Sequence, residues 1–199
     1  MFYEKKNINI SGTILSGGKN SRMGQNKAFI EINGITIIER TINIFKEIFD
    51  EIIISTNSLQ NFKLYENDVI IIPDIIKNFG PLSGIHSALS KTTKESVFFI
   101  ACDMPFIQKD IILQIINCFN ETICDCVVPK IGDSIEPLCA IYKKKINNDL
   151  QNFLKNTNNY AIKNFLKTID VHYLDLENNF FSRKLFINLN APSDLDKIK

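Results

Sequence analysis

Short apolar runs alternate with amphipathic stretches along most of the chain. The runs typical of strands are rich in Ile and Val, several of them are nearly all apolar, and they cover residues 8–15, 51–56, 69–72, 97–101, 127–128 and 138–142. Strands without polar alternation are buried on both faces, which favours a mainly parallel sheet covered by helices. The pattern therefore predicts an α/β fold.

Between these runs, apolar residues recur at helical spacing. Residues 36–49 place Ile38, Ile42 and Phe45 on one face and Glu39 and Arg40 on the other. Weaker patterns predict helices near residues 85–89, 110–119, 146–154 and 161–166, and His172 begins a late strand. Alternating strands and helices predict a Rossmann-like three-layer sandwich. Because no repeat or linker interrupts the chain, residues 1–199 are expected to form a single domain.

Composition removes several classes of function. The chain has 199 residues with 23 basic and 22 acidic side chains, so no global charge attracts nucleic acid or anionic membranes. Residues 1–9 contain no apolar signal region, and no apolar run approaches the roughly 20 residues of a membrane helix. We therefore expect a cytoplasmic protein. Its five cysteines fit buried apolar residues better than a disulfide framework or a zinc site.

The first predicted strand ends at Leu15, and Ser16 leads into a segment that combines glycines with basic residues: Gly17, Gly18, Arg22 and Lys27. Ligands of open α/β sheets bind beyond the carboxyl ends of the strands. Glycines there let backbone N–H groups approach a phosphate, Arg22 can grip its oxygens as a fork, and Lys27 can add a point charge. The spacing matches neither a P-loop nor a dinucleotide-binding fingerprint. The alternative is a glycine-rich turn with solvated basic side chains.

Two aspartates are expected at strand ends. Asp103 follows residues 97–101, and Asp74 follows the apolar run that stops at Pro73. A carboxylate among phosphate-binding cations repels the phosphates unless a metal lies between, and Mg²⁺ takes one or two carboxylates together with phosphate oxygens and water. Asp103 is therefore a candidate metal ligand, although it can instead cap the following helix. Asp74 either contacts a ligand or caps a turn.

The glycine-rich segment carries a resemblance to a known family. Leu-x-Gly-Gly-x-x-x-Arg-Met-Gly-x-x-Lys resembles the opening signature of nucleotidyltransferases that hand NMP to a phosphorylated small molecule, and it is most similar to the molybdenum cofactor guanylyltransferases. Later motifs follow in order over nearly the whole chain: Pro73-Asp74, Gly80-Pro81-Leu82-Ser83-Gly84, Cys102-Asp103-Met104-Pro105, Glu136-Pro137-Leu138-Cys139-Ala140-Ile141-Tyr142 and Asn188-Leu189-Asn190-Ala191-Pro192. Each motif alone is weak, whereas the ordered set is specific.

The resemblance implies transfer of GMP from GTP to the terminal phosphate of molybdenum-carrying molybdopterin, with release of pyrophosphate. It implies Mg²⁺ on Asp103, phosphate contacts by Arg22 and Lys27, and nucleoside contacts by Asp74 and the backbone of Gly80 and Gly84. It also implies a GTP-binding adaptor and molybdoenzyme chaperones as partners. Two alternatives stay open: a cytidylyl- or sugar-phosphate nucleotidyltransferase of the same fold, and a non-catalytic adaptor that retains the fold.

Two positions depart from the family pattern. Ser55 stands where some relatives carry Asn near the nucleotide, and Asn57 is close enough in sequence to compensate. In the C-terminal motif Ala191 replaces Thr, while Asn188 and Asn190 keep the side chains that suit a pterin or its phosphate. The alternative for this motif is a strand end followed by a helix that Ser193 caps.

Overall fold

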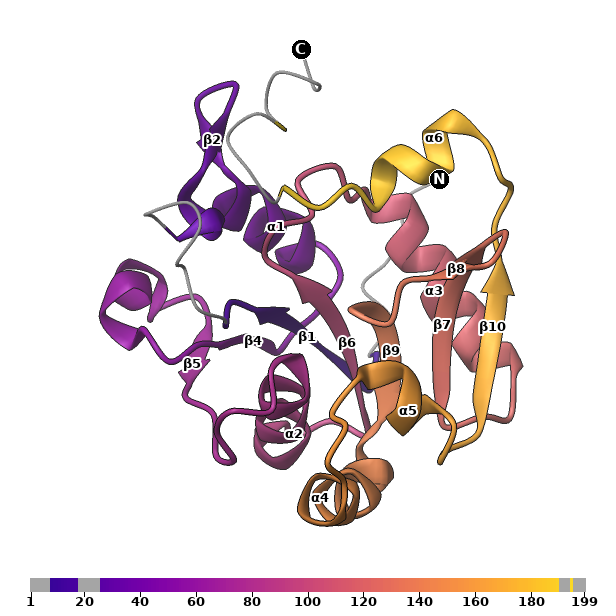
Figure 1. The fold of residues 1–199 in the computed structure, drawn as a ribbon. Helices are drawn as coiled ribbons and strands as arrows, with labels where there is room; N and C mark the ends of the chain where they lie inside the picture. The colour runs from indigo at the N-terminus through magenta and orange to yellow at the C-terminus, as the bar shows by residue number, and fades with distance from the viewer. Residues whose placement is uncertain (1–7, 18–25, 190–193, 195–199) are drawn as a thin grey trace.

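The computed structural model describes residues 8–17, 26–189 and 194. A mixed sheet runs through these residues in the strand order β10-β7-β9-β6-β1-β4-β5, with the short β8 paired to β7 (Figure 1). The strands are β1 (Ile10–Leu15), β4 (Ile52–Ser55), β5 (Ile70–Ile72), β6 (Ser96–Ala101), β7 (Cys126–Ile131), β8 (Ser134–Ile135), β9 (Cys139–Lys143) and β10 (Val171–Asp175).

Strand direction defines one functional edge of the sheet. β1 pairs in parallel with β4 and β6, β4 with β5, and β7 with β10. β9 pairs antiparallel with both β6 and β7. The six parallel strands of the main path therefore end at the same side, called the carboxyl edge below, where the reversed β9 begins. The predicted mainly parallel sheet is confirmed.

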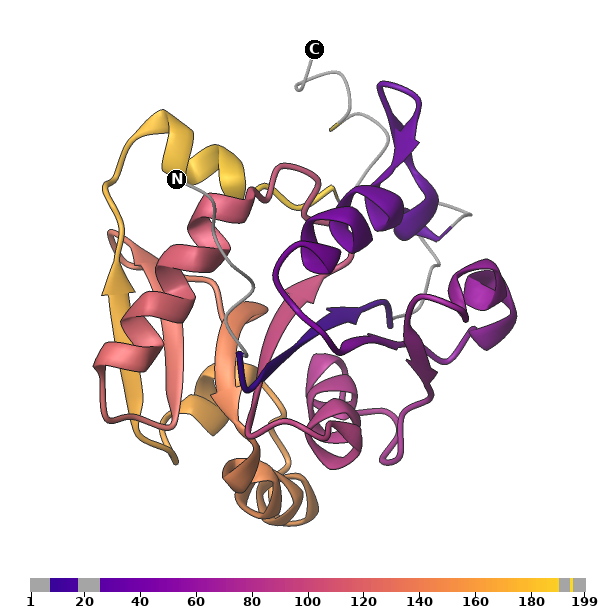
Figure 2. The ribbon, with the colours of Figure 1, turned by 180° about the vertical axis from the view of Figure 1, so that it is seen from behind.

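Helices cover both faces of the sheet. They are α1 (Ile37–Lys46), α2 (Pro81–Lys91), α3 (Lys109–Glu121), α4 (Asn147–Asn156), α5 (Ile162–Leu166) and α6 (Phe180–Leu185), with 3-10 helices η1 (Lys27–Phe29), η2 (Leu59–Tyr65) and η3 (Lys144–Ile146). Buried residues of α1 and α3 pack on one face, and those of α2, α4 and α5 pack on the other. The front and back views show these layers (Figures 1 and 2). The expected three-layer fold is confirmed.

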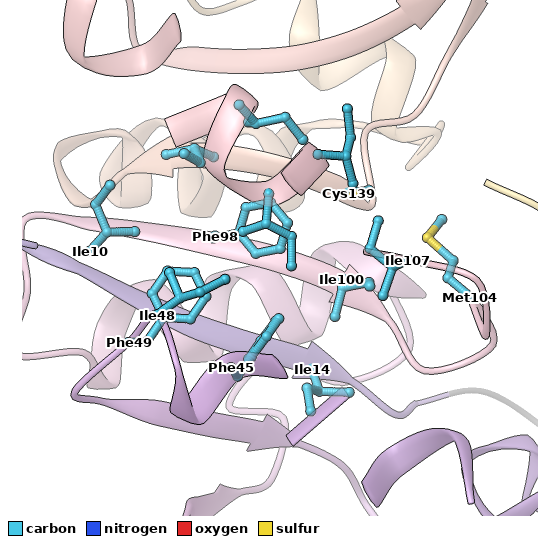
Figure 3. Close-up of a cluster of buried hydrophobic side chains, with 14 of the residues drawn as sticks. Ile10, Ile14, Phe45, Ile48, Phe49, Phe98, Ile100, Met104, Ile107 and Cys139 are labelled. Carbon is cyan, nitrogen blue, oxygen red and sulfur yellow. The ribbon is translucent and has the colours of Figure 1, made fainter. Parts of the chain in front are cut away.

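The central strand β6 serves both layers of the core. Phe98 and Ile100 point to the α1 and α3 side, whereas Val97 and Phe99 point to the α2, α4 and α5 side. Figure 3 shows Phe98 and Ile100 among the side chains of the first layer. Successive strand residues face opposite sides, so an all-apolar strand fits a sheet with helices on both faces.

Gly12 lets α1 lie close to β1. A Cβ at this position would come within 2.5 Å of Phe49 and 2.6 Å of Phe45. The two rings meet edge to face with centroids 5.0 Å apart. The packing of the two rings therefore depends on the absence of a Cβ atom at Gly12.

The start of α1 follows from local sequence. Thr36 caps the helix: its hydroxyl accepts a hydrogen bond from the Glu39 N–H, and the Glu39 carboxylate accepts one from the Thr36 N–H. Before it, β2 (Glu31–Ile32) and β3 (Ile35–Thr36) form a hairpin that the apolar pattern did not predict. Its turn residues Asn33 and Gly34 have positive φ, as Asn-Gly turns favour.

None of the helices in the described part of the chain is both long and apolar enough to cross a membrane.

Candidate active site

The backbone joins the ends of three strands at the carboxyl edge. The Ser16 N–H donates to the Ser55 carbonyl at 2.8 Å, which links the segment after β1 to the end of β4. The Cys102 N–H donates to the Leu15 carbonyl at 3.0 Å, which links the segment after β6 to β1. Residues that follow these strands are thereby held close together.

Lys27 and Asp103 form an ion pair at this edge. Lys27 Nζ lies 3.0 Å from Asp103 Oδ2, and the two side chains are 27% and 20% exposed. They are 76 positions apart in sequence, so the fold alone brings them together. Helix α3 begins at Lys109 with Gln108 as its N-cap, so Asp103 does not cap it. The pair combines a cation and a carboxylate that ligands can still reach.

Local structure positions Lys27. It begins η1, whose N-cap residue Asn26 accepts a hydrogen bond from the Ala28 N–H at 3.1 Å. The Asn26 amide group also donates to Ser16 Oγ at 3.5 Å. Asn26 therefore ties the lysine to the end of β1. Sequence reasoning missed this role, although Asn is a preferred capping residue directly before a helix.

Asp74 lies in a polar cluster beyond β4 and β5. Its carboxylate accepts hydrogen bonds from Ser55 Oγ at 3.4 Å and Asn57 Nδ2 at 2.6 Å. Its N–H donates to Asn57 Oδ1 at 3.2 Å. Asn57 thus binds both the side chain and the backbone of Asp74. Ser55 stands where some relatives carry Asn, and Asn57 is the residue expected to compensate. Both bind Asp74, the predicted nucleoside contact.

The glycines of the next loop differ in their surroundings. Gly80 has a φ of 58° and is the N-cap residue of α2, with Pro81 in the first turn. A Cβ on Gly80 would meet no atom within 4 Å, whereas one on Gly84 would lie 2.8 Å from Leu15 and 3.0 Å from Ser55 Oγ. Gly80 therefore borders open space, and Gly84 lets α2 approach the ends of β1 and β4.

The C-terminal motif runs beside Asp103. The Leu189 N–H donates to the Asp103 carbonyl at 2.9 Å, which places the neighbouring Asn188 at the same edge. Asn188 Oδ1 is buried and has no hydrogen-bonding partner among the described residues. Gly18, Arg22 and Asn190, which are predicted contacts, lie outside the described residues together with Ala191 and Ser193. Gly17 is described and exposed.

The reactive side chains around the site are kept neutral. Burial raises the pKa of the Cys102 thiol to about 11, and a hydrogen bond with Ser16 offsets only part of this effect. A thiol with such a pKa is protonated at neutral pH and is a poor nucleophile. His86 is a packed residue that is 3% exposed. Its burial lowers its pKa, and the charge of the nearby Lys155 lowers it further. These surroundings favour neither residue as a nucleophile.

No cluster of three or more His, Cys, Asp or Glu side chains is placed to hold a metal ion within residues 8–17, 26–189 and 194. The edge instead offers the Asp103 carboxylate next to Lys27, with polar groups on either side. Such a site can bind a polyphosphate by charge and can share a cation with it. It fits direct transfer between phosphates.

The sheet order and the helix layers define a Rossmann-like fold, with a cation–carboxylate pair at its carboxyl edge. Residues 12–172 match the family model of the MobA-like NTP transferase domain. The chain therefore belongs to the MobA-like NTP transferase family.

Individual relatives extend over most of the chain. It is 40% identical over 161 residues to a probable molybdenum cofactor guanylyltransferase of Clostridium perfringens, covering 80% of this chain and 79% of the relative. A probable molybdenum cofactor guanylyltransferase of Peptoclostridium acidaminophilum is 38% identical over 195 residues, which are 93% of this chain and 86% of that protein. The crystal structure of molybdopterin-guanine dinucleotide biosynthesis protein A from Archaeoglobus fulgidus has a TM-score of 0.78 at 25% identity, over 94% and 95% of the two chains.

Proposed function

We propose that this chain transfers GMP from GTP to the terminal phosphate of molybdenum-carrying molybdopterin. The products are molybdopterin guanine dinucleotide cofactor and pyrophosphate. The observation that carries the proposal is the ion pair of Lys27 and Asp103 at the carboxyl edge, in a chain of the MobA-like family. The names of the relatives, molybdenum cofactor guanylyltransferase, support GMP as the group transferred and molybdopterin as its acceptor.

The reaction is a direct displacement at phosphorus. A terminal phosphate oxygen of the acceptor attacks the α-phosphorus of GTP in line and forms the new P–O bond. The bond from the α-phosphorus to the oxygen bridging the β-phosphate breaks, and its electron pair leaves with pyrophosphate. Lys27 stabilises the negative charge that develops, and the backbone at Gly17 approaches the phosphates. Arg22 and Gly18 are proposed to complete this contact.

Magnesium fits the residues that are present. Asp103 is part-buried at a strand end, and Mg²⁺ is commonly held by one or two carboxylates with phosphate oxygens and water as its other ligands. We propose that Asp103 holds the ion and that the ion, when bound, neutralises charge on the phosphate oxygens. Lys27 and Asp103 attract each other, so the lysine also holds the carboxylate in place.

The remaining groups would orient the two substrates. Asp74 and Ser55, with the backbone of Leu15, Ser16, Gly80 and Gly84, lie on the β1, β4 and β5 side and are proposed to bind the nucleotide. Asn188 and Asn190 are proposed to bind the acceptor. A GTP-binding adaptor and molybdoenzyme chaperones remain expected partners.

Thermal unfolding with each of GTP, CTP, ATP and UTP, with and without Mg²⁺, tests the nucleotide half of the proposal. A ligand at about a hundred times its Kd adds roughly 2.7 kcal/mol to the stability of the folded state, which is an easily measured rise in Tm. We expect a rise that is specific for GTP and larger with Mg²⁺. Asp103→Asn is the matched variant, in which the gain from Mg²⁺ should disappear.

The other outcomes are equally informative. A preference for CTP would replace guanylyl transfer with cytidylyl transfer on the same fold. Absence of a shift with every nucleotide would contradict the proposal and favour the non-catalytic adaptor. GMP transfer itself is measured with molybdopterin as acceptor, by release of pyrophosphate.

A further inference from the structure

Glu136 lies at the carboxyl edge but has no place in the mechanism above. It precedes β9, and β9 begins where β6 ends, since Cys139 pairs with Ile100 in the antiparallel ladder. Asp103 follows the same end of β6. The proposed nucleotide groups lie beyond β1, β4 and β5, on the other side of β6. Glu136 therefore belongs to the half of the edge that the nucleotide groups leave open.

The backbone around Glu136 is fixed. Its N–H donates to the Pro129 carbonyl at 2.9 Å, and its carbonyl accepts from the Cys139 N–H at 3.0 Å. The hydroxyl of the buried Tyr142 donates to the Pro137 carbonyl at 2.8 Å. The backbone that carries the Glu136 side chain is therefore held in a defined position.

The carboxylate of Glu136 is half-buried and has no hydrogen-bonding partner among the described residues. Burial raises its pKa, and the exposed Lys163 at the start of α5 opposes this effect. The other neighbouring titratable group is the Cys139 thiol, which is fully buried and whose pKa is also raised by burial, so it stays neutral. An ionised group that loses water without gaining donors is destabilising unless a ligand supplies them.

An aromatic contact connects this region to the nucleotide side. Phe79, directly before Gly80, meets Tyr160 edge to face with ring centroids 4.7 Å apart. Tyr160 lies just before α5, the helix that carries Lys163. Figure 1 shows α5 in front of β9. The Gly80 loop and the surroundings of Glu136 therefore border the same face of the sheet.

We propose that Glu136 recognises the pterin ring of the acceptor by accepting hydrogen bonds from its ring N–H and its 2-amino group. These two donors lie side by side on the pyrimidine ring of a pterin, and a carboxylate can accept both. Guanine presents the same pair of donors. The position of Glu136, across β6 from Asp74 and Gly80, favours the pterin as their source. The inference rests on the proposed function, because it concerns the acceptor of that reaction.

Binding of a pterin phosphate and its lumazine counterpart tests the inference. Lumazine carries an oxygen in place of the 2-amino group, and binding of either compound is followed by its fluorescence. The wild-type protein should prefer the pterin by about tenfold or more, because a charge-assisted hydrogen bond is lost with lumazine. In Glu136→Gln this preference should fall to near unity. Asp133→Asn, in the exposed turn between β7 and β8, removes the same charge nearby and should retain the preference.

A second arm identifies the source of the donors. The affinities for GTP and for ITP, which lacks the 2-amino group, should keep their ratio in Glu136→Gln. If Glu136→Gln abolishes the preference for GTP over ITP and keeps the preference for the pterin over lumazine, Glu136 binds guanine and the inference is overturned. Unchanged pterin preference in Glu136→Gln would overturn it as well.

Failure of the inference is separable from failure of the proposed function. If the wild-type protein binds no GTP and transfers no GMP, the proposed function fails irrespective of Glu136. If GMP transfer is intact and Glu136→Gln leaves the KM for molybdopterin unchanged, only the inference fails. A lowered Tm in Glu136→Gln would also contradict it, since removal of an unpartnered charge should not destabilise the fold.

Discussion

Asp103 places a negative charge where the proposed ligand carries several, and cations must offset that repulsion. Lys27 supplies one such cation, with its amino group 3.0 Å from the carboxylate, although the two residues lie 76 positions apart in sequence. The carboxylate is 20% exposed, so a metal and a phosphate can approach it. The chemical character of both residues could be predicted from their sequence motifs, whereas their direct contact could not.

Asp103→Asn should lower the rate of GMP transfer by about a hundredfold or more, a typical loss when a charge-stabilising group is removed. Asparagine keeps the shape and one oxygen toward Lys27, so the folded structure should persist. Pyrophosphate release measures the rate, and circular dichroism checks the fold. Turnover near that of the wild-type enzyme would exclude Asp103 as the metal-binding residue.

Asn57→Asp should raise the KM for GTP about tenfold with little change in kcat. The new carboxylate oxygen would replace the Nδ2 group that now lies 2.6 Å from Asp74 Oδ2, and two negative oxygens would repel each other. Asp74 would then lose its orientation without any effect on the reacting phosphates. Steady-state kinetics with GTP varied measure both constants. Asn61→Asp, at an exposed position of η2, is the control and should leave KM unchanged.

At the scale of elements, apolar periodicity predicted the strands and long helices because their burial is nearly continuous. It could not give the reversed direction of β9, since an all-apolar strand is buried on both faces in either orientation. The β2–β3 hairpin was missed because its two strands have two residues each, although its Asn33-Gly34 turn is a readable signal. Sequence motifs supplied the candidate site residues, Glu136 among the motif positions, while the surroundings of its side chain follow only from the tertiary structure.

Gly12→Ala should destabilise the fold by roughly 1–3 kcal/mol, as overpacked cores do. The added methyl would lie within 2.6 Å of ring atoms of Phe45 and Phe49, so α1 would have to move away from β1. Urea unfolding measures the free energy of unfolding. Gly17→Ala is the matched control, because a Cβ there meets no atom within 4 Å. Equal stability of the two variants would show that the close approach of α1 is not required.

At the scale of the whole molecule, two carboxylates at opposite edges of the sheet have different surroundings. At the edge where β4 and β6 begin, Glu51 accepts hydrogen bonds from Thr92 and Thr93, and Thr92 in turn pairs with Ser11 at 2.9 Å. At the carboxyl edge, Glu136 and Asn188 Oδ1 have no such partners among the described residues. Glu51 is satisfied by groups of the protein, whereas the carboxyl edge keeps Glu136 and Asn188 Oδ1, which a ligand can satisfy.

This difference predicts opposite effects of pH on two carboxylates. Burial alone would raise the pKa of Glu51, but the hydrogen bonds from Thr92 and Thr93 outweigh it and lower the pKa below 4.5. Glu51 therefore stabilises the fold above pH 4.5, and this contribution is lost as the pH falls through its lowered pKa. Glu136, whose pKa is raised above 4.5, destabilises the fold when ionised and is relieved as the pH falls through that raised pKa.

Urea unfolding of Glu51→Gln, Glu136→Gln and the wild-type protein between pH 3 and 8 measures both effects. At pH 7 the first variant should be less stable than the wild-type protein and the second at least as stable. Both differences should shrink toward acid pH, that of Glu136→Gln beginning above pH 4.5 and that of Glu51→Gln below it. Destabilisation by Glu136→Gln at neutral pH would mean that its carboxylate supports the fold, and the two carboxylates would then not differ in their effect on stability.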